Sequence, residues 1–172
     1  GETADSLAGL RLCKEKGIKT LGIVNVVGSS IAREADDVFY TLAGPEISVA
    51  TTKAYSCQLV AGYLLAMQFA KARGEITDEE FTELTEEINT IPEKIKRILD
   101  DKERLQWFAS KIVNILDDLF IGSGIDYAIG MEGSLKLKEI SYIHSEAYAG
   151  GELKHGPISL IEDGTVVFSI AT

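Results

Sequence analysis

The sequence predicts an α/β protein, in which helices cover both faces of parallel sheets to give three layers. Continuous apolar runs at residues 18–27 and 165–170 are typical of strands that are buried on both faces. Stretches with helical periodicity alternate with these runs, and short turns that contain glycine join them. This alternation favours parallel pairing, because each helical crossover returns the chain to the same edge of the sheet.

The elements expected in the first part of the chain alternate between helix and strand. Leucines at near-helical spacing and a closing Gly17 mark the first helix, and Gly44-Pro45 ends the second strand. We expect a helix over 4–16, a strand over 18–27, a turn or short helix over 28–35, a strand over 38–42 and a single helix over 51–73.

The segment that follows, residues 75–116, differs in character. It is rich in aspartate and glutamate and has repeated helical periodicity, with Pro92 as the expected break. We expect two or three amphipathic helices whose acidic faces are solvated, and no binding function for them.

After this connector the α/β pattern resumes. We expect a strand over 119–121, a tight loop over 122–124, a helix over 126–143 and a strand over 165–170. The chain is therefore expected to hold two partial α/β domains joined by helices. The three regions are 1–74, 75–116 and 117–172.

Composition restricts the classes of partner. The chain has 172 residues, of which 45% are apolar and 26% charged, as in ordinary globular proteins. Its net charge of −10 argues against a nucleic acid or an anionic membrane surface as partner. A small anionic ligand stays compatible, because backbone N–H groups at a helix N-terminus bind phosphate whatever the net charge. No apolar run is long enough to span a bilayer.

The two cysteines, Cys13 and Cys57, are far apart and lie in helical patterns. We expect two buried thiols in a reducing compartment, so we expect the protein in the cytoplasm. The chain begins without methionine inside a motif and ends directly after a strand-like run. We therefore expect it to be a piece of a longer protein.

Two threonines precede predicted helices, where free backbone N–H groups can hold a phosphate. Thr3 follows Gly1-Glu2, and Thr51 follows Ala50. Considered alone, each is more simply interpreted as a helix N-cap, which contributes about 1 kcal/mol. Both interpretations stay open at this point.

Glu132, Lys136 and Glu139 share one face of a predicted helix, because offsets of four, three and seven residues stack side chains. An acid, a cation and a second acid could move protons on a polar substrate. A surface salt-bridge ladder of little energetic value is the plainer alternative. The helix follows a strand and a Gly-Ser-Gly turn, at the sheet edge where ligands bind in open α/β folds.

His155 is the better functional candidate of the two histidines, because Gly151 and Gly156-Pro157 bracket a short turn that could present it. His144 fits a structural role. No third ligand is spaced sensibly for zinc, so we expect no metal. The Gly122-Ser123-Gly124 turn lacks the third glycine of a dinucleotide fingerprint, so we expect no nucleotide cofactor.

Taken together, these segments resemble the sugar-isomerase (SIS) domains of glutamine–fructose-6-phosphate aminotransferases, which make glucosamine 6-phosphate. The resemblance extends over nearly the whole chain, while the acidic connector matches only in length and character. It implies two partial SIS domains of the flavodoxin-like type. The segments that carry it are Gly1–Asp5, Asn25–Ser30, Ala43–Ile47, Thr52–Tyr55, Leu135–Tyr148 and Gly151–Pro157.

The resemblance implies that the first domain binds the sugar phosphate. Thr3 would contact the phosphate at the end of a serine-rich loop. Val49 and Thr51 would line the sugar site, where the family commonly has serine in place of Thr51. Ser123 stands where the family often has arginine, and nothing in the sequence explains this difference.

The resemblance also implies roles for the second domain. Glu139 would be the base that moves a proton between C1 and C2 of the sugar. Lys136 would assist at the C2 oxygen, and Glu132 would help to order the site. His155 would open the sugar ring, and it would come from the neighbouring subunit of a homodimer.

No metal or organic cofactor is implied. Ammonia would come from a glutaminase domain in the full-length protein, and a C-terminal lysine of the family would form a Schiff base with the ketose. Neither is present here, so we expect the isolated chain to be catalytically incomplete. Two alternatives stay open: a stand-alone SIS-type sugar-phosphate deaminase or deglycase, and a non-catalytic sugar-phosphate sensor domain.

Overall fold

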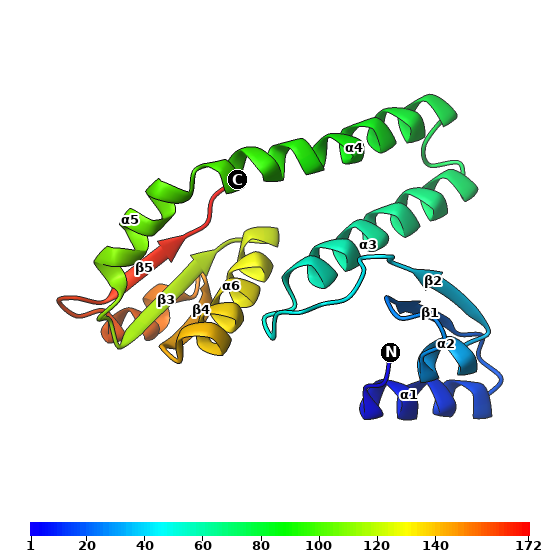
Figure 1. Ribbon diagram of the computed structural model, residues 1–172, viewed down its shortest axis with the longest axis horizontal. Helices are drawn as coiled ribbons and strands as arrows, with labels where there is room; N and C mark the ends of the chain where they lie inside the picture. Colours follow the sequence, from blue (N-terminus) through cyan, green and yellow to red (C-terminus); the bar gives the residue numbers. More distant parts are fainter. The chain divides into compact units, whose positions relative to one another are not determined.

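The computed structural model describes all 172 residues (Figure 1). The chain divides into two compact units, residues 1–94 and residues 95–172, which we call unit 1 and unit 2. The division into regions 1–74, 75–116 and 117–172 stays a prediction. None of the helices is both long and apolar enough to cross a membrane.

Unit 1 begins with two parallel strands flanked by helices. In chain order it contains α1 (Ala4–Glu15), β1 (Leu21–Val24), α2 (Ser30–Glu34), β2 (Asp37–Tyr40) and α3 (Thr52–Ala72). β1 pairs with β2 from Leu21 opposite Asp37 to Val24 opposite Tyr40. β1 is shorter than the expected strand over 18–27. It ends where Asn25 turns its side chain to the loop after β2, binding the N–H of Ala43 at 2.8 Å and the carbonyl of Gly44 at 2.6 Å.

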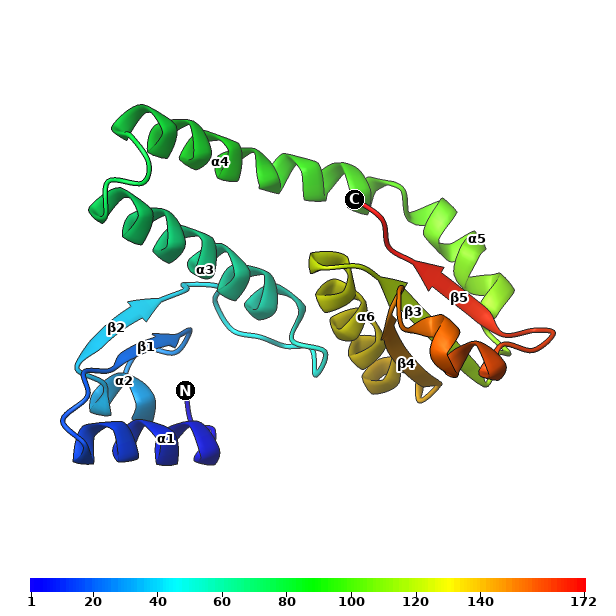
Figure 2. The same ribbon diagram turned by 180° about the vertical axis from the view of Figure 1, so that it is seen from behind.

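The next helix, α4 (Asp78–Asp100), runs without interruption through Pro92, so the predicted break at this proline was wrong. Thr77 and Glu80 start the helix with a capping box, in which each side chain accepts from the other's backbone N–H. Proline removes one backbone hydrogen bond, but the apolar stripe of α4 continues past it. The first part of α4 runs beside α3 (Figure 2). Leu84, Ile88 and Ile91 of its apolar stripe line a groove of about 340 Å³ together with residues of α3. The break falls instead at Asp101, before α5 (Lys102–Ile112).

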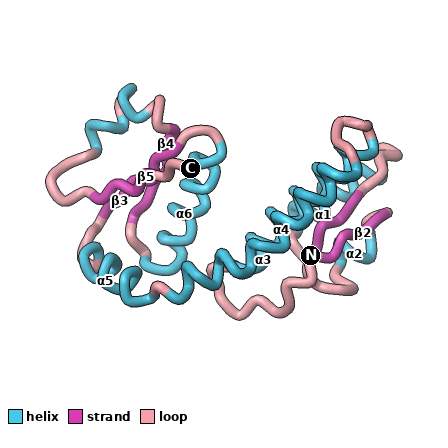
Figure 3. The backbone as a smooth tube through the Cα atoms, turned by 90° about the horizontal axis from the view of Figure 1, so that it is seen from above, coloured by secondary structure: helices cyan, strands magenta, loops and turns pink.

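Unit 2 is built around a sheet of three parallel strands in the order β4-β3-β5. Figure 3 colours these strands magenta and the helices cyan. The elements after α5 are β3 (Asp117–Gly122), α6 (Ile125–Ser141), β4 (His144–Ala149), the 3-10 turns η1 (Leu153–His155) and η2 (Pro157–Leu160), and β5 (Val166–Ser169). The predicted α/β class with parallel sheets is confirmed. β4 was not foreseen, because its first three residues, His144, Ser145 and Glu146, are polar and it contains no apolar run of the kind found in β1 and β5.

Half-buried and partly exposed aromatic side chains pack together in unit 2, which also contains the buried Leu119. Phe120 of β3 stacks on Phe168 of β5 with ring centroids 4.6 Å apart, and Phe108 of α5 meets Phe168 edge-on at 5.9 Å. A β-carbon placed on Gly133 would lie only 2.8 Å from the Phe120 ring. Glycine on this face of α6 therefore lets the helix approach the sheet and fixes its position.

Candidate functional site

The start of α1 lies over the carboxyl end of β1. A β-carbon on Gly1 would come within 2.4 Å of the Ser29 Oγ atom and 3.0 Å of Val24, so only glycine fits there. Thr3 occupies the N-cap position of α1, but its side chain makes no capping hydrogen bond. The capping interpretation of this hydroxyl is therefore wrong, and it is left free beside the unpaired N–H groups of the first helical turn.

The segment before α1 is bound to the start of α2. The carboxylate of Glu2 accepts hydrogen bonds from the Ser30 backbone N–H at 2.7 Å and from the Ser30 hydroxyl at 2.6 Å. These bonds hold the pKa of Glu2 below its ordinary value. Sequence reasoning missed this pair, because 28 residues separate the two side chains and no local spacing links them.

Thr51 precedes α3 in a left-handed backbone conformation, with φ 57° and ψ 41°. This conformation is strained for a β-branched residue, and such strain concentrates at functional sites. Its hydroxyl bonds to the carbonyl of Val49 at 3.1 Å and does not cap α3. Glu46 instead accepts from the Ala54 N–H at 3.3 Å. Val49 itself is 87% exposed, as a residue lining an open site would be.

In unit 2, α6 brings the three predicted charged residues together. The Lys136 Nζ atom lies 2.7 Å from Glu139 Oε2 and 3.4 Å from Glu132 Oε1. The three side chains are about one quarter exposed, which limits the water around them. The hydrogen bond to Glu139, and then that to Glu132, raises the pKa of Lys136, so the ammonium stays protonated. The cluster holds one cation between two carboxylates.

The charged cluster lies towards the end of α6 that is farther from its first turn. At about 1.5 Å per residue, Glu139 is roughly 20 Å along the axis from the start of the helix. The carboxyl edge of β3, where α6 begins, is therefore not where this cluster lies. A substrate bound at the start of α6 would therefore not contact Glu139, so a pocket around the charged cluster needs a further element beside this part of α6.

The two histidines differ in their surroundings. His155 ends the exposed turn η1, where Gly156 follows with a positive φ. His144 pairs with Asp117 at 2.9 Å and lies 3.6 Å from Glu146, which fits the expected structural role. Ser123 lies beside Gly150, in the loops that follow β3 and β4, and nothing in the structure explains why it replaces arginine.

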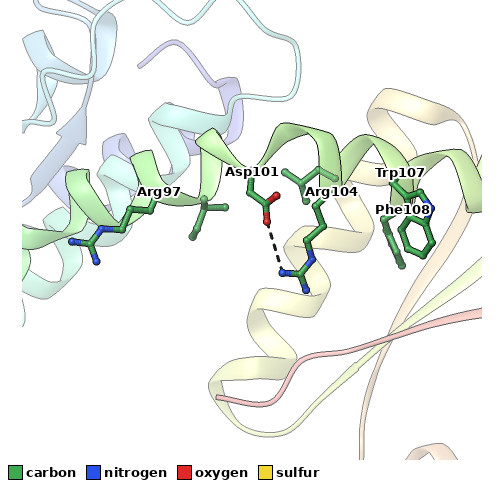
Figure 4. Close-up of a pocket in the computed structure, with 7 residues that line it drawn as sticks. Arg97, Asp101, Arg104, Trp107 and Phe108 are labelled. Atoms are coloured by element: carbon green, nitrogen blue, oxygen red, sulfur yellow. Dashed lines mark ion pairs between the residues drawn. The ribbon is translucent and has the colours of Figure 1, made fainter.

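The clearest hollows in the structure do not include the predicted residues. One of them, of about 570 Å³, lies along the end of α4 and α5, where Arg97, Asp101 and Arg104 line it together with Trp107 and Phe108 (Figure 4). No group of three or more His, Cys, Asp or Glu side chains could hold a metal ion. Cys13 and Cys57 are free, and both are half-buried rather than fully buried as expected. The seven predicted residues thus divide between the two units, with Thr3, Val49 and Thr51 in unit 1 and Glu132, Lys136, Glu139 and His155 in unit 2.

Asp118 lies under α6 and is a buried carboxylate that the predicted site does not use. It is 1% exposed, and its Oδ1 accepts from the Ser145 hydroxyl at 2.6 Å, while Oδ2 has no partner. Burial raises its pKa above the ordinary value of 3.8, although the Ser145 hydrogen bond acts in the opposite direction. A raised folded-state pKa means that the folded chain binds this proton more tightly than the unfolded chain does.

Asp118→Asn is therefore expected to stabilise the chain at neutral pH, by about 2–4 °C in melting temperature. This gain should shrink as the pH falls through the folded-state pKa, and it should vanish below the ordinary carboxyl pKa, where both states are protonated. Thermal melts from about pH 3 to about pH 8 measure it. The neighbouring exposed Asp117→Asn should show no such gain. A D118N gain that does not change with pH would contradict the interpretation.

Comparison with known proteins identifies the family to which this fold belongs. The SIS domain family matches residues 1–68 and 119–172. The glutamine–fructose-6-phosphate aminotransferase [isomerizing] of Clostridium tetani is 59% identical over the whole chain, which spans 28% of that relative's length. The C-terminal domain of glucosamine-fructose-6-phosphate aminotransferase from Francisella tularensis superposes with a TM-score of 0.95 at 40% identity, over 99% of this chain and 49% of that one.

A third similarity concerns a different enzyme of related chemistry. The glucosamine-6-phosphate deaminase of Thermotoga maritima matches 98% of this chain and 49% of its own, with a TM-score of 0.70 and 28% identity. The matched residues include both parallel sheets and the helix that carries the charged cluster. The fold, the glycine-backed start of α1 and the family match lead to one conclusion: this chain belongs to the SIS domain family.

Proposed function

We propose that this chain is the central part of the isomerase portion of a glutamine–fructose-6-phosphate aminotransferase. The reaction converts fructose 6-phosphate and glutamine-derived ammonia to glucosamine 6-phosphate. The observation that carries the proposal is the position of Lys136 between Glu132 and Glu139 on α6. The 59% identity to an aminotransferase of this name supports it.

The chemistry follows from the charged cluster. Conversion of the ketose imine to the aldose requires a proton to leave C1 and a proton to reach C2. Glu139 is the base that carries it, since an ionised carboxylate can take a carbon-bound proton and return it to the neighbouring carbon. When the C1 proton leaves, the electron pair moves towards the atom bound to C2, which is oxygen in the free ketose and nitrogen once ammonia has added. Lys136 stabilises the negative charge that develops at that atom, and Glu132 holds the ammonium in place. The residues present need no metal or organic cofactor for this step.

The remaining predicted residues bind and prepare the sugar. The phosphate lies at the free N–H groups of α1 with the Thr3 hydroxyl, while Val49 and the strained Thr51 line the sugar. His155, from the neighbouring subunit of a homodimer, opens the sugar ring. The exposed position of η1 suits a residue that acts across a subunit boundary.

This assignment implies further domains and a second subunit in the full-length protein. The full-length protein would be a cytoplasmic homodimer with a glutaminase domain. Regions 1–74 and 117–172 would be parts of two SIS domains, with 75–116 as their connector. The isolated chain would be catalytically incomplete, because the ammonia source lies outside it.

A graft tests the proposal. Residues 1–172 replace the corresponding 28% of the Clostridium tetani relative, and formation of glucosamine 6-phosphate from fructose 6-phosphate and glutamine is measured. We expect turnover within about tenfold of the parent enzyme, because a 59% identical segment should preserve the packing around the site. A folded, dimeric graft without turnover would contradict the proposal.

The second candidate, a stand-alone sugar-phosphate deaminase, has less support, because the Thermotoga maritima deaminase is 28% identical to this chain and the Clostridium tetani aminotransferase is 59% identical. The same graft separates the two functions. A deaminase segment would release ammonia from glucosamine 6-phosphate and form fructose 6-phosphate, without using glutamine. An aminotransferase segment would give net synthesis that depends on glutamine.

A further inference from the structure

The start of α2 is capped by a side chain from a distant segment. Ser29 occupies the N-cap position of α2 and is only 3% exposed, yet its hydroxyl makes no capping bond and has no partner. The Glu2 carboxylate takes the N-cap role instead, by accepting from the Ser30 N–H and hydroxyl. The N–H of Ile31 donates to the carbonyl of Gly1 at 3.0 Å. Three hydrogen bonds thus join residues 1–2 to the first turn of α2, and we call this arrangement the Glu2 clasp.

The guanidinium of Arg33 adds further hydrogen bonds to the Glu2 clasp. The Arg33 Nη2 atom donates to the Ser30 Oγ atom at 3.1 Å, and Arg33 also bonds to the carbonyl of Gly28. The Ser30 hydroxyl therefore donates to Glu2 while it accepts from Arg33. Hydrogen bonds in which one partner is ionised are stronger than neutral ones, so this arrangement favours a single position for the Glu2 side chain.

The Glu2 clasp restricts the position of Thr3, the next residue in the chain. Thr3 has no hydrogen bond from its own side chain to α1, so capping does not fix its orientation. The backbone on its N-terminal side is fixed by the Glu2 clasp and by the contact of Gly1 with Ser29 and Val24. A carboxylate so near an anion site would repel a free phosphate, but Ser30 directs both oxygens of Glu2 towards α2, where the Arg33 guanidinium partly offsets the negative charge.

We propose that Glu2 is a positioning residue for the substrate's phosphate, acting through its hydrogen bonds to Ser30 and not by contact with the ligand. It holds Gly1 and Thr3 so that the Thr3 hydroxyl and the free N–H groups of α1 converge on one anion. The inference rests on the proposed function, because it takes the start of α1 as the phosphate subsite. The inference adds to that function the hydrogen bonds that fix the backbone of the phosphate subsite.

Two variants disrupt the Glu2 clasp, one by changing the acceptor Glu2 and the other by changing the donor Ser30. Glu2→Gln keeps the shape of the side chain but turns an amide NH₂ towards a Ser30 donor, and Ser30→Ala removes the hydroxyl. The matched control is Glu15→Gln, at the other end of α1, whose exposed side chain makes no ion pair or hydrogen bond. In the graft, we expect KM for fructose 6-phosphate to rise about tenfold in E2Q and S30A, the usual effect of losing a charge-assisted hydrogen bond. We expect kcat to stay within about twofold, because the bond-making residues are untouched.

Comparing the change in KM with the change in kcat distinguishes a residue that positions the phosphate subsite from one that only supports folding. A variant that merely folds less well lowers the active fraction and hence the apparent kcat, with KM unchanged. The inhibition constant of inorganic phosphate should rise by the same factor as KM. An E2Q or S30A graft that keeps the KM of the E15Q control, or that loses only kcat, would overturn the proposal.

A second measurement does not depend on turnover. NMR titration of the 172-residue chain with inorganic phosphate should shift the amide signals of the first turn of α1, with about tenfold weaker binding in E2Q and S30A than in E15Q. If the unchanged graft is inactive but the clasp variants still weaken phosphate binding, the proposed function fails and the Glu2 clasp stands. If phosphate binding is the same in all three variants, the clasp is refuted whatever the activity.

Discussion

Glu139→Gln in the grafted enzyme is expected to lower kcat for glucosamine 6-phosphate formation by about 10²–10⁴-fold, the usual contribution of a general base. Glutamine has nearly the same shape as glutamate but cannot take a proton from carbon. The Lys136 ammonium keeps its second carboxylate partner, Glu132 at 3.4 Å, so the position of the cation should change little. The proposed phosphate subsite lies in unit 1 on residues that E139Q leaves unchanged, so we expect KM to stay within about threefold.

Steady-state kinetics with fructose 6-phosphate and glutamine measure this loss. Glu103→Gln in α5 serves as the control, because it removes an exposed glutamate of unit 2 that makes no ion pair or hydrogen bond. Glutaminase activity, assayed separately, should be the same in the parent graft and in both variants. An E139Q enzyme that retains more than about a tenth of the parent kcat would show that another group moves the proton.

Gly122→Ala is expected to unfold unit 2 or to destabilise it by roughly 3 kcal/mol or more, the upper range for overpacking. A β-carbon on Gly122 would lie 2.5 Å from the carbonyl carbon of Asp126 and 2.7 Å from the backbone nitrogen of Tyr127. These are backbone atoms of the first turn of α6, so no side-chain rotation can relieve the overlap. The helix must move away from β3, and the aromatic contacts behind it would open.

Urea unfolding, followed by the fluorescence of the single tryptophan, Trp107 in α5, measures this effect within unit 2. Gly151→Ala is the control, since a β-carbon there meets nothing within 4 Å and its backbone is not left-handed. The control should shift the free energy of unfolding by less than about 0.5 kcal/mol. Equal stability of G122A and G151A would mean that α6 does not approach β3 this closely.

Sequence-based prediction was most accurate for features that depend only on the helical or strand periodicity of neighbouring residues. The spacing of Glu132, Lys136 and Glu139 is enough to place them on one helical face, and the structure brings their charged atoms within 4 Å in pairs. The long helix α3 and the amphipathic connector also follow from local periodicity. The class of fold follows in turn, because strand and helix alternate.

Tertiary contacts account for the elements and residues that were missed or misjudged. β4 was missed because its polar residues pair across the sheet, as Ser145 does with Asp118 and His144 with Asp117. Pro92 lies inside a helix because the loss of one backbone hydrogen bond does not outweigh the packing of the apolar residues before it, such as Leu84 and Ile88, beside α3. Long-range contacts, and not local propensity, decide such positions.

Residues far apart in sequence also set the surroundings of the candidate site. Glu2 depends on Ser30, a pairing that no pattern within one helix or strand reveals. The roles of Thr3, Val49, Thr51 and His155 came from family resemblance, and they stay predictions. Their backbone geometry could not be foreseen, since the strain at Thr51 arises from the loop that leads into α3.

The contact between Gly133 and the Phe120 ring has a practical consequence for redesign of this fold. Because a side chain on that face of α6 would collide with the ring, the depth of the helix against the sheet cannot be tuned by substitution there. Substitutions meant to change the ligand of the proposed site should leave Gly133 and Phe120 intact. Diversity is better introduced in the loop before α3 and in the turn that ends at His155, where side chains already face open space.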